Sequence, residues 1–169
     1  MRRLLLFALA LLLEGCAGPL PRSITQPPPV AVSVRQAQKE VMRDLSREVR
    51  WGGEIIEVWN RSDHTDVLVL GRELKRGGEP REEGEVDGRF IARFGGFMDP
   101  ARFPKGRMLT VSGPLIGVET HPVGDYPYRY PVVQVTAWHL WPQSEPRSYY
   151  HDPWWPYYPG CLWRYPCWW

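Results

Sequence analysis

The sequence has very little net charge for its size. It contains 21 Lys and Arg residues and 19 Asp and Glu residues among 169, which leaves a formal charge of +2. A domain dedicated to nucleic acids normally carries a strong excess of basic residues. We therefore expect no nucleic-acid partner.

Histidine is scarce as well, and the motifs of common active sites are missing. None of the four histidines has a cysteine, a glutamate or another histidine at metal-ligand spacing: His64, His121, His139 and His151. There is no Gly-x-Ser-x-Gly elbow, no phosphate-binding loop and no Gly-x-Gly-x-x-Gly fingerprint. We expect no metal, no cofactor and no catalytic residues, and the protein is predicted not to be an enzyme.

The one long apolar run is too short to cross a membrane. It extends from Leu4 to Leu13 and follows two arginines. As a helix, ten residues would span about 15 Å, half of a bilayer core. A basic start, a short apolar run and a small residue are typical of an export signal. Residues 1–15 are therefore predicted to be a signal peptide.

Cysteine is rare, and each of the three cysteines has a predicted role. Cys16 directly follows the signal and is the candidate lipidation site discussed below. Cys161 and Cys167 form an even pair in an exported, oxidising setting, which favours a disulfide between them. The alternative is two reduced thiols.

Proline is abundant near the start of the mature chain. Gly18–Pro21 and Pro27–Pro29 fall within residues 16–32, where dense prolines favour an extended chain. We expect this stretch to be a tether that lifts the folded domain off a membrane. Beyond it, an apolar stripe and the cap residue Ser33 predict a helix over Ser33–Arg47.

Residues 33–142 are predicted to form one mainly β domain. Five segments are rich in β-branched and aromatic residues, with bends expected at Gly52–Gly53 and Gly113–Pro114. A small five-stranded, partly open barrel of the OB type with one N-terminal helix fits this pattern, and a β-sandwich is the alternative. The predicted strands are Val49–Trp59, Asp66–Leu74, Gly88–Phe94, Met108–Glu119 and Tyr130–Trp141.

Two groups of residues are candidates for a binding surface. Arg50, Trp51 and Arg89 could lie on one concave strand face, although arginines on a strand more often face water. Tyr126, Tyr128 and Tyr130 alternate with prolines in a predicted stiff loop. Their rings could stack on a sugar, a lipid or a partner, or they could plug one end of the barrel.

The last segment, residues 143–169, is unusually aromatic. Ten of the 22 aromatic residues of the chain lie between Tyr149 and Trp169, among prolines that block regular structure. Trp and Tyr favour the membrane–water interface. The tail is predicted to contact a bilayer, an envelope protein or cell-wall glycan, or else to fold against its own domain.

Leu13-Glu14-Gly15-Cys16 resembles the lipobox of bacterial lipoproteins, with Glu14 where a small residue is usual. The resemblance implies a diacylglyceryl group on the Cys16 thiol, cleavage after Gly15 and acylation of the new amine, typically with palmitate. Ala17 implies the outer membrane and not the inner one. The mature protein would then be a membrane-anchored lipoprotein.

Further segments resemble the Slp family of starvation-inducible outer-membrane lipoproteins, over roughly residues 27–142. The resemblance implies an envelope protein linked to starvation or acid stress, on the periplasmic face of the outer membrane and without catalysis. The alternative is an OB-type binding module for an oligosaccharide or a small envelope ligand. The segments are Val49–Gly53, Gly88–Ala92, Gly96–Pro100, Gly106–Gly113, Tyr126–Val135 and His139–Trp141.

Overall fold

The structure, a computed structural model, describes residues 20–143. Strands dominate this range, with two α-helices, α2 (Arg22–Thr25) and α3 (Val34–Asp44), and a short 3-10 helix, η2 (Pro100–Arg102). The strands are β1 (Glu48–Asn60), β2 (His64–Arg72), β3 (Val86–Gly95), β4 (Met108–Val123), β5 (Tyr126–Gln134) and β6 (Ala137–Leu140).

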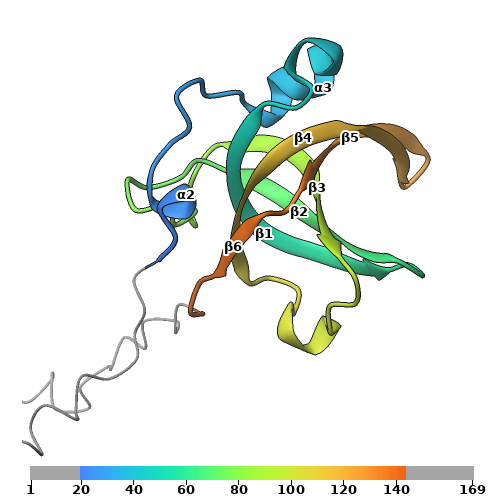
Figure 1. Ribbon diagram of the computed structural model, residues 1–169. Coiled ribbons are helices and arrows are strands. Elements are labelled where there is room, and N and C mark those ends of the chain that lie inside the picture. Colours follow the sequence, from blue (N-terminus) through green and yellow to red (C-terminus); the bar gives the residue numbers. More distant parts are fainter. Residues whose placement is uncertain (1–19, 144–169) are drawn as a thin grey trace, which may run out of the picture.

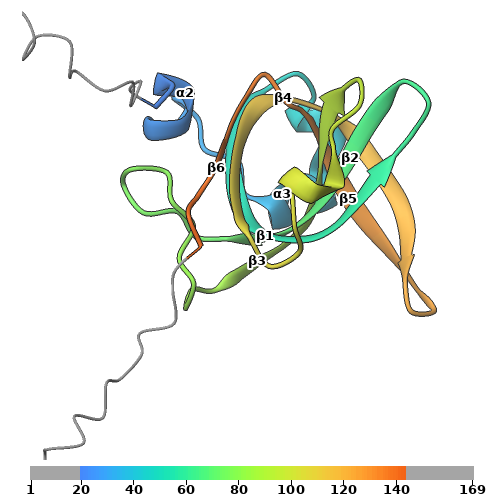
Figure 2. The same cartoon turned by 90° about the horizontal axis from the view of Figure 1, so that it is seen from below.

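Five of the strands pair in a closed ring. The order is β1–β2–β3–β5–β4, and β4 pairs again with β1. Every pairing in the ring is antiparallel except that of β3 with β5. Figure 2 looks into the ring, with β6 added along β4. The mainly β class is confirmed, and one ringed sheet is compatible with the OB-like prediction.

The last predicted strand is in fact two strands. β5 ends at Gln134, where it pairs with β3, and the chain then crosses over to pair with β4 as β6. At the crossing, Thr136 donates its backbone N–H to the Ser112 carbonyl. This crossing brings the Gln134 carbonyl so close to Gly113 that a Cβ there would lie 1.9 Å from its oxygen. Tyr126–Pro131, predicted to be a loop, is the first half of β5 and pairs with β4.

Gly52 and Gly53 are the point where the ring closes. Both residues pair with β2 on one side and with β4 on the other. The pairing of β1 with β2 is regular at these two glycines, and its register shifts further along, between Ile55 and Glu57. A Cβ on Gly53 would lie 1.9 Å from the Leu70 carbonyl oxygen. The strands can therefore coil this tightly only if position 53 has no side chain.

The main core fills the ring. It gathers inward-facing side chains from β1 to β5, including Ile55, Val69, Phe90 and Val111. Trp51 is 6% exposed and packs edge-on against Phe90, with ring centroids 5.3 Å apart. Apolar burial of this kind is the largest favourable contribution to folding.

The proline-rich segment is packed against the ring through two apolar side chains. Ile24, on α2, is fully buried, and Val32 is buried as well. The Val32 carbonyl accepts a 2.7 Å hydrogen bond from Trp51 Nε1. Ser33 then caps α3, as predicted, by accepting the Gln36 backbone N–H. Residues 20–32 are therefore part of the domain, in contrast to the free tether that the prolines predict.

Replacing Gly53 with Ala should destabilise the fold by about 3 kcal/mol, the upper end for overpacking, because the new Cβ would collide with the Leu70 carbonyl. Gly95→Ala is the matched control, since a Cβ at position 95 meets no atom within 4 Å, and it should change stability by less than about 0.5 kcal/mol. Urea unfolding of the non-lipidated mature chain measures both. Equal midpoints for the two variants would contradict the close approach.

Candidate functional site

A second, smaller cluster covers the outer face of the sheet. Side chains of a strand point alternately to its two faces. Along β3, Phe90, Ala92 and Phe94 accordingly enter the core, and Ile91 and Arg93 point the other way. Ile91 packs with Leu68, Tyr130 and Val132. This face lies over β2, β3 and β5, between the β1–β2 and β4–β5 turns, which is the face that OB-folds use for oligonucleotides and oligosaccharides.

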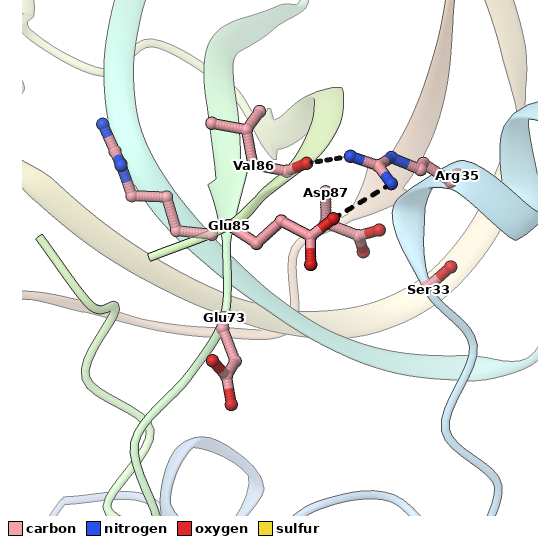
Figure 3. A pocket seen from close by; sticks show the side chains of 7 residues that line it. Ser33, Arg35, Glu73, Glu85, Val86 and Asp87 are labelled. Atoms are coloured by element: carbon pink, nitrogen blue, oxygen red, sulfur yellow. Dashed lines mark hydrogen bonds and ion pairs between the residues drawn. The ribbon is translucent and has the colours of Figure 1, made fainter. Parts of the chain in front are cut away.

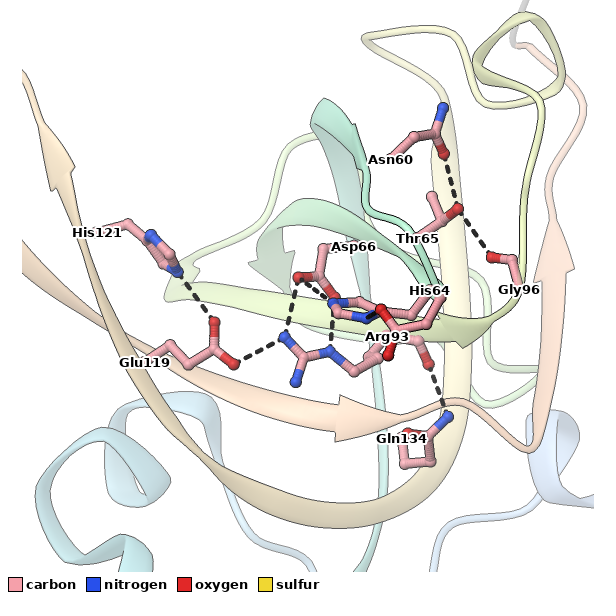
Figure 4. A network of polar contacts seen from close by, with 10 residues as sticks. Asn60, His64, Thr65, Asp66, Arg93, Gly96, Glu119, His121 and Gln134 are labelled. Carbon is pink, nitrogen blue, oxygen red and sulfur yellow. Dashed lines mark hydrogen bonds and ion pairs between the residues drawn. The ribbon is translucent and has the colours of Figure 1, made fainter.

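Arg93 is the centre of a polar network on this face. Its Nε lies 2.8 Å from Asp66 Oδ1 and its Nη2 lies 2.9 Å from Asp66 Oδ2. The same Nη2 lies 2.7 Å from Glu119 Oε1. Figure 4 shows how Arg93 joins the carboxylates of β2 and β4 across the sheet. Two-pronged pairs of this kind are among the strongest charge-assisted contacts.

Two histidines extend this outer-face network, defined as His64, Asp66, Arg93, Glu119 and His121. His121 Nε2 lies 3.0 Å from Glu119 Oε2, and His64 Nε2 lies 3.4 Å from Asp66 Oδ2. Burial raises the pKa of Glu119, but the hydrogen bonds and charges of His121 and Arg93 outweigh it, so that the pKa lies below its ordinary value. The hydrogen bonds to Asp66 raise the pKa of Arg93 against the effect of its partial burial.

Aromatic rings close the face above the network. Trp59, near the end of β1, packs edge-on against His121 of β4, with ring centroids 5.1 Å apart. Tyr130 lies 6.0 Å from the same His121 ring and 4.8 Å from Tyr128. Side chains of β1 and β4 thus contact each other over the part of the sheet where an OB-fold offers a concave face to a ligand.

The network is built to hold strands together. The Asp66 side chain is only 2% exposed, and both of its oxygens face the guanidinium of Arg93. A general acid or base must present its titrating group to a substrate, and this carboxylate is turned inward. Since each charge is matched by a neighbour, the arrangement favours a structural role for these residues.

The residues predicted for one concave surface do not meet there. Trp51 belongs to the core. Arg50 donates from Nη1 to the Ile24 carbonyl, 3.1 Å away, which attaches α2 to β1. Burial lowers the pKa of Arg50. Arg89 lies elsewhere, with its guanidinium 5.9 Å from the centre of the Tyr128 ring.

The three predicted tyrosines lie along β5 and differ in exposure. Tyr130 is buried, and Tyr128 is half-buried, with its hydroxyl accepting the Arg89 backbone N–H at 2.9 Å. Tyr126 is 68% exposed. The group therefore offers one free ring at the β4–β5 turn and not a platform of three.

A polar hollow of about 270 Å³ lies beside the start of α3. Figure 3 shows Arg35 reaching across it to Glu85, 3.4 Å away, and to the Val86 carbonyl. Asp87 Oδ2 accepts the Val34 backbone N–H at 2.8 Å. A carboxylate at a helix start is a stabilising cap, so these contacts join α3 to β3.

Several predicted features fall outside the described residues. They are the signal peptide, Cys16, Cys161, Cys167 and the aromatic tail beyond Gln143. Within residues 20–143, no group of three or more His, Cys, Asp and Glu side chains could hold a metal ion. In the same range, no helix has the length and apolarity that a membrane span requires.

Local sequence patterns predict the outer-face network only weakly. Arg93 is a polar residue of an alternating strand, a position that usually faces water, whereas its side chain is only 20% exposed. Asp66, Glu119 and His121 were not singled out. An acid at the start of the apolar stretch Val67–Leu70 is the one hint, because a lone carboxylate in a buried strand needs a partner.

Comparison with known proteins gives one family and several relatives. The model of the outer membrane lipoprotein Slp family matches residues 13–169, so the match extends beyond the predicted range and includes the aromatic tail. An uncharacterized lipoprotein of Escherichia coli, YeaY, is 32% identical over 92% of this chain and 81% of its own length. The outer membrane protein Slp of the same organism is 25% identical over 97% of this chain and 87% of its own length.

Two further similarities are to a second uncharacterized protein and to a solved structure. An uncharacterized protein of Haemophilus influenzae is 32% identical over 87% of this chain and 80% of its own length. Among solved structures, a small single-stranded DNA-binding protein from Streptomyces coelicolor matches 56% of this chain and 94% of its own, with 11% identity. Its TM-score is 0.34, which is too low to carry an inference about ligand or fold.

Replacing Arg93 with Gln should lower the free energy of unfolding by about 3–5 kcal/mol, because it leaves the buried Asp66 carboxylate without a counter-charge. Arg89→Gln is the matched control on the same strand face and should cost about 1 kcal/mol or less. Adding Asp66→Asn to Arg93→Gln should restore part of the loss. Urea unfolding measures all four proteins, and no recovery in the double variant would contradict the pairing.

The depressed pKa of Glu119 makes its contribution depend on pH. Because the folded-state pKa lies below the ordinary value of 4.5, the stabilisation is complete above that value and is lost as the pH falls through the folded pKa. Glu119→Gln should therefore be less stable than the unaltered protein at pH 7, and the difference should shrink at pH 3. Urea midpoints at the two pH values test this, and a constant difference would refute it.

Proposed function

The chain belongs to the outer membrane lipoprotein Slp family, and we propose that it is an outer-membrane protein held by acyl chains on Cys16, with a structural, non-catalytic role in the envelope. The observation that carries the proposal is the extent of the family match. It starts at residue 13, so it includes the lipobox-like Leu13–Cys16 together with the whole folded domain.

Anchoring by lipid accounts for the chemistry of the N-terminus. One acyl chain binds a bilayer only marginally, whereas several together hold a protein stably. A diacylglyceryl group on the thiol and a further chain on the amine would give Cys16 this stable hold. The periplasmic face of the outer membrane is the proposed location.

The structural role is supported by the way the domain uses its polar groups. On the face that an OB-fold would offer to a ligand, Trp59 contacts His121, and the charged groups of the outer-face network pair with one another. Such a domain can act by contact, as a stable body displayed at the membrane. A link to starvation or acid stress is the role that the family resemblance suggests.

Lipidation is tested by the mass of the N-terminal peptide and by cell fractionation. The native protein should carry acyl chains on Cys16 and sediment with outer membranes until detergent is added. Cys16→Ser, exported behind an ordinary cleavable signal, should lack the added mass and appear in the soluble periplasmic fraction. Cys161→Ser is the matched control and should remain lipidated. An unmodified Cys16 in the native protein would contradict the proposal.

A further inference from the structure

The segment between the lipid site and the ring is attached to the domain almost from its start. Ile24 is fully buried, and its carbonyl accepts from Arg50 Nη1. The loop Lys75–Glu79 packs against the same turn so closely that a Cβ on Gly78 would lie 2.2 Å from the Ile24 carbonyl oxygen. α2 is therefore held from two directions, by β1 and by this loop.

This attachment shortens the stretch of chain between Cys16 and the folded domain. A free tether over residues 16–32 would span roughly 50 Å at about 3.1 Å per residue. Eight residue steps separate Cys16 from Ile24, the first buried residue of the described chain, and eight extended steps reach about 29 Å at most. A domain of this size is roughly 30 Å across. The segment is therefore too short to extend around the domain to its far side.

The chain leaves the domain at the same side. α2 contacts β6, the last strand. Both views place α2, the Lys75–Glu79 loop and β6 on the left of the molecule, with the β1–β2 and β4–β5 turns on the right. Arg107 fixes the end of the described chain, since its Nη2 and Nε donate to the Trp141 carbonyl at 2.7 and 3.1 Å.

The residues beyond this exit suit a lipid surface. Gln143 is the last described residue, and the Trp- and Tyr-rich stretch 149–169 begins a few positions later. Such side chains favour the membrane–water interface. Arg22 on α2 and Arg76 in the Lys75–Glu79 loop are exposed, and exposed Glu82 lines a hollow together with Gln143. The charges of this side are mixed, and the orientation follows from chain length.

We propose that the side formed by α2, the Lys75–Glu79 loop and the end of β6 rests on the lipid surface of the membrane. The β1–β2 and β4–β5 turns then point away from the bilayer, and the aromatic tail emerges where it can reach the lipid headgroups as a second attachment. This orientation rests on the lipidation of Cys16 proposed above.

Photo-cross-linking on the full lipidated chain tests the orientation. Benzoylphenylalanine replaces one residue at a time, Arg22 or Arg76 on the proposed membrane side and Arg61 or Asp125 at the two turns. All four positions are exposed, so the fold should tolerate the probe. The proteins are reconstituted in vesicles of phosphatidylethanolamine and phosphatidylglycerol, irradiated, and analysed for lipid adducts by mass spectrometry.

We expect at least tenfold more lipid adduct at positions 22 and 76 than at positions 61 and 125. Equal yields, higher yields at the turns, or no adduct at any position would overturn the orientation. The intact mass of each sample reports the acyl chains on Cys16 separately. Lipidated protein with the wrong adduct pattern refutes the orientation alone, whereas a bare Cys16 refutes the proposed function.

Discussion

The closure of the ring depends on how closely the backbones of β1, β2 and β4 approach at Gly52 and Gly53. Each glycine pairs on both sides, and a side chain at Gly53 would occupy the place of the Leu70 carbonyl. If this approach were lost, β1 could not pair with β2 and β4 at once, and the sheet would open. Trp51, the residue just before, would then lose its contact with Phe90.

A closed ring still has an outer face, and here that face is covered from within the chain. β4 and β5 extend past the residues of β4 that pair with β1. His121 of β4 contacts Trp59, and Tyr130 and Tyr128 of β5 continue this row of rings. Below these rings, Arg93 neutralises Asp66 and Glu119. A buried pair of this kind adds less net stability than its short distances suggest, because its charges lose hydration. Its main effect is to fix which strands lie side by side.

Local features were predictable because they depend on neighbours in sequence. The alternation along β3, the cap at Ser33 and the mainly β class all follow from patterns a few residues long. The pairing of Asp66 with Arg93 depends on the register of β2 against β3, which no local pattern encodes. The same is true of the strand change after Gln134, where β5 gives way to β6 through contacts with distant Ser112.

The proline-rich segment shows the same limit with a functional consequence. Its composition favours an extended chain, and Pro27–Pro29 do interrupt regular structure. The segment is nevertheless attached to the domain, because the side chains of Ile24 and Val32 are buried. Full burial of a side chain such as Ile24 contributes about 1.5–3 kcal/mol, enough to offset the ordering of a residue or two. Attachment of this segment is therefore a matter of packing, and packing shortens the chain between the domain and the proposed lipid site at Cys16. If Cys16 carries the proposed lipid, a tether inferred from the prolines alone would place the domain roughly 20 Å too far from the membrane.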